Sequence, residues 1–133
     1  MKLLVSPNKI DDIDKLIDLN INSFLYGIKD LSLYQKFYIN INELKDIIKK
    51  YPNSGIFISL NKLMHNSDIN YLKETLTELN KLNIKGILYD DVAILNITEE
   101  LNLHLNLIWA STHLVTNYHT INSLKNKMGS MWK

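Results

Sequence analysis

The chain alternates between short apolar runs and stretches in which apolar residues recur every three or four positions. The runs lie at residues 3–5, 23–26, 55–60, 86–89 and 105–109, and most of them are followed directly by polar or turn-forming residues. Such runs are typical of buried strands. The three- and four-residue spacing between them predicts helices with one apolar face. Strands that alternate with helices indicate βαβ units, and therefore a parallel sheet.

Most of the predicted helices follow a residue that commonly caps a helix N-terminus. The segment 28–41 is apolar but has no regular period, so we expect a packed loop with a short helical turn there. The expected caps and helices are Asn8 before 10–19, Asn42 before 43–51, Ser67 before 68–82, a short buried helix at 92–97, and Ser111 or Thr116 before a last helix that reaches Met128.

Five such βα units fit either an open doubly wound sheet or part of an eight-stranded barrel. Residues 130–133 look like the start of a sixth strand. The prediction is therefore an α/β fold that forms a partial TIM-type barrel, as one truncated domain over 1–133. An open flavodoxin-like binding domain is less favoured, because Ser6-Pro7-Asn8-Lys9 stands where a glycine-rich phosphate loop would follow the first strand.

Composition excludes several classes of function. The formal net charge is +1, and the basic residues are lysines spread along the chain, so composition gives no indication of nucleic-acid binding. The chain has no cysteine, which excludes disulfides, thiolate catalysis and cysteine-held clusters within these residues. We expect no cofactor. The amino terminus lacks a signal peptide or membrane span, so we expect a cytoplasmic protein without membrane contact.

Candidate chemistry gathers where the last two strands end. Asp90 and Asp91 follow one strand, and Ser111, Thr112 and His113 follow the next. Two carboxylates can serve as general acid and base or bind a metal, but neighbouring strand residues face opposite sides, so at most one of them points inward. A helix N-cap is the structural alternative for Asp91, and we consider it the stronger one.

The histidines and asparagines give weaker candidates. His113 beside Ser111 suggests a nucleophile and its base, although triad partners normally come from separate segments. His113 and His119 are not spaced to share a metal on one helix, so no metal site is predicted. Asn61 and Asn117 are candidate ligand-binding residues, because an amide donates and accepts at once. Bonding to the local backbone is their structural alternative.

Several segments match the pattern of a known family. They are the strand and proline of Leu4-Val5-Ser6-Pro7, the apolar core and glycine of 22–27, Asn61 after the third strand, Asp91-Val92-Ala93 after the fourth, and the frame of 109–117 after the fifth. In these segments the chain resembles the amino-terminal part of the collagenase-like peptidases, peptidase family U32. The resemblance spans essentially all of the chain.

The resemblance implies a TIM-type barrel and a hydrolase that acts on peptides, with Asp91 as the inward carboxylate. Some relatives use cysteines beyond the sixth strand to hold an iron–sulfur cluster and take part in hydroxylation of tRNA, rRNA or ubiquinone precursors. This chain lacks those cysteines. We therefore expect a U32 peptidase-like protein of doubtful independent activity. The alternative is a non-catalytic half-barrel that is completed by a homodimer or a complementary half-barrel chain.

Overall fold

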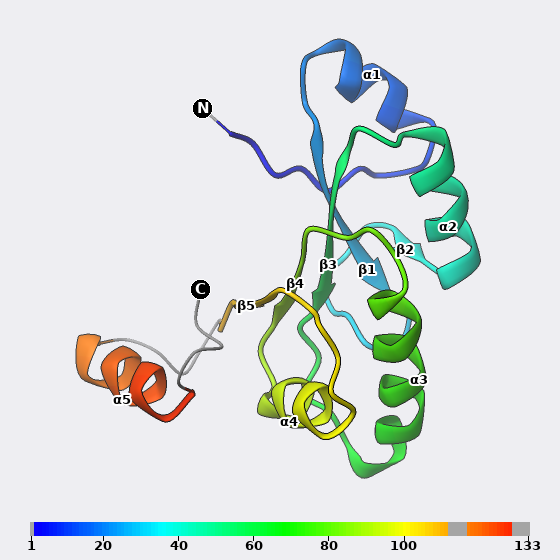
Figure 1. Cartoon of the computed structure of the whole chain (residues 1–133). Helices are drawn as coiled ribbons and strands as arrows, with labels where there is room; N and C mark the ends of the chain where they lie inside the picture. Colours follow the sequence, from blue (N-terminus) through cyan, green and yellow to red (C-terminus); the bar gives the residue numbers. More distant parts are fainter. Residues whose placement is uncertain (1, 112–116, 129–133) are drawn as a thin grey trace.

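The computed structural model describes residues 2–111 and 117–128 of the chain (Figure 1). They form a mixed α/β fold around a five-stranded, wholly parallel sheet with strand order β2-β1-β3-β4-β5. The strands are β1 (Ser23–Ile28), β2 (Tyr38–Ile39), β3 (Gly55–Leu60), β4 (Gly86–Tyr89) and β5 (Leu107–Trp109). The helices are α1 (Asp12–Asp18), α2 (Ile41–Lys50), the 3₁₀ turn η1 (Asn66–Asp68), α3 (Ile69–Asn80), α4 (Val92–Glu100) and α5 (Tyr118–Met128).

One face of the sheet is covered by helices and contains the core. Figure 1 shows α2, α3 and α4 along the same side of the strands. Because strand residues alternate between faces, the register places one set of fully buried residues on this side. They are Phe24 and Tyr26 of β1, Ile56, Ile58 and Leu60 of β3, and Ile87 of β4. Leu44 of α2 and Leu72 and Leu76 of α3 are equally buried and complete this core.

The opposite face, here called the open face, is apolar but less covered. Leu25 pairs with Phe57, and Leu88 pairs with Ile108, so these four side chains share that face. The first three are half-buried, and Ile108 on the edge strand β5 is 37% exposed. The sheet therefore has one face that is buried under helices and one apolar face that is partly exposed.

The strand expected at residues 3–5 is reduced to one isolated bridge. Val5 lies opposite Phe24, donates its N–H to Ser23 and accepts from the N–H of Leu25. Because Val5 already lies beside the start of β1, the residues before it reach past that strand and remain exposed. The prediction of a full strand here is wrong.

The segment 28–41, predicted as an irregular loop, differs from that prediction in two features. β1 continues through Gly27 to Ile28, and the two-residue strand β2 pairs with this extension. A two-residue strand is too short to show alternation, so the hydrophobic pattern could not reveal it.

The cap of α2 is Asn40 rather than the expected Asn42. The Asn40 side chain accepts from the N–H of Glu43, and the Glu43 carboxylate accepts from the N–H of Asn40, each at 2.9 Å. This reciprocal pair is a capping box. It moves the helix start to Ile41, two residues before the predicted start.

The caps of three other helices differ as well. Helix α1 begins at Asp12, after a turn in which Asp12 donates to the carbonyl of Lys9, and not after Asn8. Before α3, the Asp68 carboxylate accepts from the N–H of His65, so the 3₁₀ turn takes the place of a Ser67 cap.

At α5, the Asn117 side chain accepts from the N–H of Thr120 at 3.0 Å. Asn117 therefore caps this helix in place of Ser111. The other expected cap, Thr116, and the predicted sixth strand at 130–133 lie outside the described residues. Within the described ranges, no helix combines the length and hydrophobicity needed to cross a bilayer.

Candidate functional site

The carboxyl ends of the parallel strands meet along one edge of the sheet, here called the carboxyl edge. β1 continues into Lys29, β3 into Asn61 and Lys62, and β4 into Asp90 and Asp91. Sites in parallel α/β folds collect at this edge, because loops of variable chemistry follow each strand there. The edge is therefore the first place to look for function.

The loop 29–37, between β1 and β2, is fixed to the carboxyl edge by side chains. The carboxamide oxygen of Asn61 accepts from the N–H of Leu33 at 2.8 Å, and its NH₂ group donates to the carbonyl of Leu33 at 3.2 Å. The buried hydroxyl of Ser32 accepts from the N–H of Ile28 at 2.8 Å and donates to the carbonyl of Ser59. The loop is thus attached to both β1 and β3.

A cavity of about 390 Å³ lies beside this loop at the carboxyl edge. Its lining comes from the start of the loop, from β2 and from the end of β3. Lys62 forms an ion pair with Asp68 at 2.8 Å, and hydrogen bonding from Lys62 lowers the pKa of the Asp68 carboxyl. The lining residues are Lys29, Asp30, Ser32, Leu33, Tyr38 and Lys62.

Tyr34 stands at the tip of the same loop. It directly follows Leu33, its side chain is 93% exposed, and its φ is 60°. That left-handed conformation is unfavourable for a bulky L residue, and such outliers cluster at functional sites. The loop therefore exposes an aromatic ring to solvent one residue after Leu33, which lines the cavity.

Asp91 has a clear structural role. One carboxylate oxygen accepts from the N–H of Ala93 at 2.8 Å, and the other accepts from the N–H of Met64 at 2.7 Å. The first bond caps α4, and the second ties the β4–α4 turn to the loop that follows β3. Both oxygens are thus engaged with backbone.

Two of the other predicted site residues, Asn61 and Asn117, are engaged by contacts of their own. Asn61 lies at the end of the neighbouring strand but is engaged with Leu33, and Asn117 caps α5. His113 lies outside the described residues, as does Thr112. The roles proposed for Asp91, His113, Asn61 and Asn117 in catalysis or ligand binding remain predictions. Among the described residues, no group of three or more acidic or histidine side chains is placed to hold a metal.

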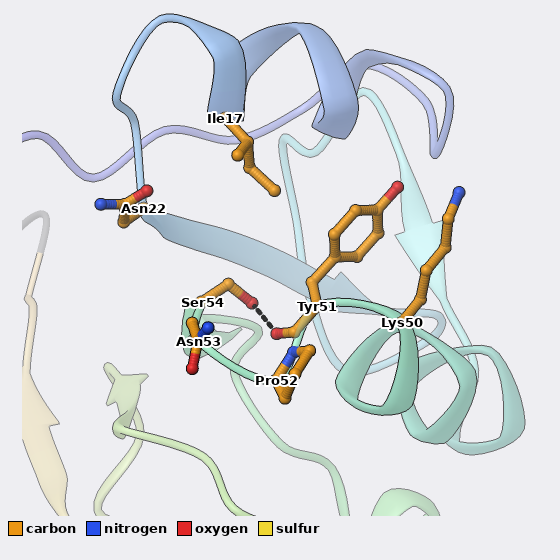
Figure 2. A pocket seen from close by; sticks show the side chains of 7 residues that line it. All are labelled: Ile17, Asn22, Lys50, Tyr51, Pro52, Asn53 and Ser54. Atoms are coloured by element: carbon orange, nitrogen blue, oxygen red, sulfur yellow. Dashed lines mark hydrogen bonds between the residues drawn. The ribbon is translucent and has the colours of Figure 1, made fainter.

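A second cavity, of about 270 Å³, lies at the opposite end of the strands (Figure 2). There the Tyr51 hydroxyl donates to Asp14 at 2.8 Å, and the Lys50 ammonium lies 3.5 Å from the other oxygen of Asp14. The pKa of Lys50 is raised, first by the Tyr51 side chain and then by the Asp14 carboxylate. These contacts connect α1 to α2, so we interpret this end as structural.

Tyr26 places a polar atom in the helix-covered core. The hydroxyl of Tyr26 has no hydrogen-bond partner within the described part of the chain, and the side chain is 1% exposed. Burial, and to a lesser extent Tyr51, raises the pKa of Tyr26. The phenol therefore stays neutral and serves the core as an aromatic ring.

A parallel sheet with helices on one face, and with loop-borne polar groups at its carboxyl edge, defines an α/β protein of the class that places its sites at that edge. The model of peptidase family U32 matches residues 8–130. The chain therefore belongs to peptidase family U32, as the sequence motifs predicted.

The chain is also similar to a protein named "tRNA hydroxylation protein P2" from Bacillus subtilis (strain 168). The two are 26% identical over 123 residues, which make up 91% of this chain and 40% of that relative. The chain thus spans less than half the length of the curated relative it matches. No solved structure matches the chain significantly.

Sequence reasoning missed the loop 29–37 as a candidate site. Its signal was a pair of exposed apolar residues, Leu33 and Tyr34, between lysines in a segment without period. Lys62 follows an apolar run in the sequence, but its place in a cavity depends on how the loop folds.

Proposed function

We propose that this chain forms the amino-terminal half of a U32-type barrel that takes part in the hydroxylation of tRNA. In this proposal the half-barrel has little activity alone. It works when further strands, from a second copy or from a complementary half-barrel chain, complete the sheet.

The observation that carries the half-barrel proposal is the open face. In a closed α/β barrel, helices cover the outside of the strands, and apolar side chains fill the inside. Here α2, α3 and α4 lie on one side (Figure 1), and Leu25, Phe57, Leu88 and Ile108 line the other. Further strands would bury these side chains and would pair the outer edge of β5.

The similarity to a tRNA hydroxylation protein supports RNA modification as the activity of the completed barrel, since it extends over 91% of this chain. Peptide hydrolysis, which the family name suggests, ranks second. The carboxylate first considered for that chemistry, Asp91, binds two backbone N–H groups, as a structural carboxylate does.

Cysteine-held clusters do not fit this chain, because it contains no cysteine. The residues present offer no thiolate ligands for such a cluster, so we assign this chain no step that involves one. Its contribution is to form half of the barrel and to bind substrate at the carboxyl edge.

A chimera tests the proposal. This chain replaces the matching 123 residues of the Bacillus relative, in cells that lack that relative, and the nucleosides of digested tRNA are analysed by mass spectrometry. We expect the nucleoside that is heavier by one oxygen atom to reappear. Unmodified tRNA with a folded chimera would contradict the proposal. Cleavage of gelatin by the chimera, without tRNA modification, would favour the peptidase alternative.

A further inference from the structure

We propose that the loop 29–37 is a binding site for single-stranded RNA, in which a nucleobase stacks on Tyr34 and the adjoining phosphates lie near Lys29 and Lys62. This inference rests on the proposed function and names the surface that would contact the tRNA substrate. It concerns binding only.

The first argument is the presentation of the Tyr34 ring. At 93% exposure the side chain adds little to the core, yet its backbone has a φ of 60°. Every nucleobase has a π-face that can stack on an exposed aromatic ring, whatever its sequence. Stacking of a ligand on this ring would explain an exposed tyrosine that contributes little to folding.

The second argument is that the loop is held in place before any ligand arrives. Asn61 binds both backbone groups of Leu33, the residue just before Tyr34. Leu31 is fully buried and accepts from the N–H of Lys62 at 3.3 Å. A ring on a fixed loop loses less freedom on binding than a ring on a mobile one.

The third argument is the chemistry of the adjoining cavity. Lys29 and Lys62 both contribute to its lining; Lys29 is exposed, and Lys62 is half-buried in its ion pair with Asp68. The carboxylate of Asp30 can accept from the amino group of a base. With the nearby Tyr34 ring, this set matches a nucleotide, which has an anionic, an amino and a flat aromatic part.

The pairing of β1 argues against a peptide as the occupant. Peptides commonly bind by adding a strand to a free sheet edge. β1 has β3 along one side, and β2 and Val5 along the other. Strand addition is therefore blocked at β1, and the edge strand β2, which follows the loop, is only two residues long.

The modest charge of the chain agrees with this mode of binding. Two lysines can contact about two phosphates, so the logarithm of the affinity should fall with the logarithm of salt concentration with a slope of about −1.4. Stacking, and not a basic stripe, would supply most of the affinity.

The test is a fluorescence anisotropy titration of the full chain with a labelled single-stranded RNA of about twelve nucleotides. Tyr34→Ala should weaken binding about five-fold or more, and Tyr34→Trp should preserve it. Tyr118→Ala, which removes another exposed tyrosine from α5, is the matched control and should bind like the original chain. Thermal melts confirm that each variant folds.

Equal affinity of the original chain and Tyr34→Ala would overturn the inference, and so would the absence of RNA binding by the original chain. A Tyr34-dependent complex with a gelatin peptide, in place of RNA, would overturn it in favour of a peptide. Tyr34-dependent RNA binding with an inactive chimera would overturn the proposed function and leave this site standing. An active chimera that is indifferent to Tyr34→Ala would do the reverse.

Discussion

The carboxamide of Asn61 pairs with both backbone groups of Leu33, as one peptide unit pairs with another in a sheet. A side chain at the end of β3 thereby takes the place of a neighbouring strand for the loop 29–37. Since Tyr34 follows Leu33, this pairing also holds the backbone just before Tyr34. A residue first considered as a ligand-binding group thus acts on the candidate site through the loop.

Asn61→Asp tests this pairing. The substitution keeps an acceptor for the N–H of Leu33, but it removes the donor to the Leu33 carbonyl and places a negative charge there. We expect the free energy of unfolding to fall by about 1 kcal/mol and the Leu33 amide to exchange faster with solvent. Urea denaturation and hydrogen exchange by NMR measure the two effects.

Asn106→Asp is the control for this substitution, because Asn106 makes a similar bond to the carbonyl of Lys85. It should cost similar stability and leave exchange at Leu33 unchanged. Unchanged exchange at Leu33 in the Asn61 variant would show that the loop does not depend on Asn61.

Two substitutions of Asp91 test its role as a structural carboxylate. Asp91→Ala removes the cap of α4 and the bond to Met64, so it should destabilise the chain by about 2–3 kcal/mol. Asp91→Asn retains one acceptor oxygen and should cost about half as much. Chemical denaturation of both variants measures this order. If both variants keep full stability, the two bonds do not have the role assigned to them here.

The contacts of Asp68 should make the stability of the chain depend on pH. Hydrogen bonding from Lys62, and then from the N–H of His65, lowers its pKa in the folded state. A folded pKa below the unfolded one means that the stabilisation is complete above about pH 4 and is lost as the pH falls through the folded value. The thermal midpoint should therefore drop at acidic pH, and Asp68→Asn should reduce this drop.

Glu78 provides a check on that prediction, because Lys81 and then Lys45 lower its pKa as well. Adding Glu78→Gln to Asp68→Asn should further reduce the drop of the thermal midpoint at acidic pH. If the thermal midpoint drops equally at acidic pH in the original chain and in both variants, Asp68 and Glu78 do not cause the drop.

Tyr34→Gly separates strain from function. Glycine adopts a φ near 60° without steric cost, so the substitution should raise the free energy of unfolding by up to about 1 kcal/mol while abolishing stacking. Asn102→Gly is the matched control: Asn102 has a φ of 50°, but asparagine tolerates that region, so little gain is expected. A loss of stability in Tyr34→Gly would mean that the tyrosine ring supports the loop.

The sequence predicted the strands best where apolar runs were long enough to show a pattern. The runs at 55–60 and 86–89 match β3 and β4 residue for residue. Caps were predicted less well, because asparagines and aspartates stand before most helices and spacing alone ranks them poorly. At α2, the glutamate three residues after Asn40 decided the start.

The candidate site was harder to predict than the strands. Asn61 and Asp91 were correctly placed just after strands, because each follows an apolar run. The contacts of Asn61 with Leu33 and of Asp91 with Met64 join segments that are 28 and 27 residues apart, and periodicity carries no information on such contacts. The left-handed Tyr34 was equally invisible, since its residue type disfavours that conformation.

Ile108 tests the half-barrel through its oligomeric state. It lies on the open face of the edge strand β5, with its side chain 37% exposed. If a second copy covers this face, the original chain should melt at higher temperature as its concentration rises. Ile108→Lys should remove that dependence, because it would bury an unpaired charge in the contact. Leu101→Lys, at the end of α4 and also 37% exposed, should retain it. Sedimentation equilibrium gives the mass directly, and a monomer with a concentration-independent melt would exclude completion by a second copy.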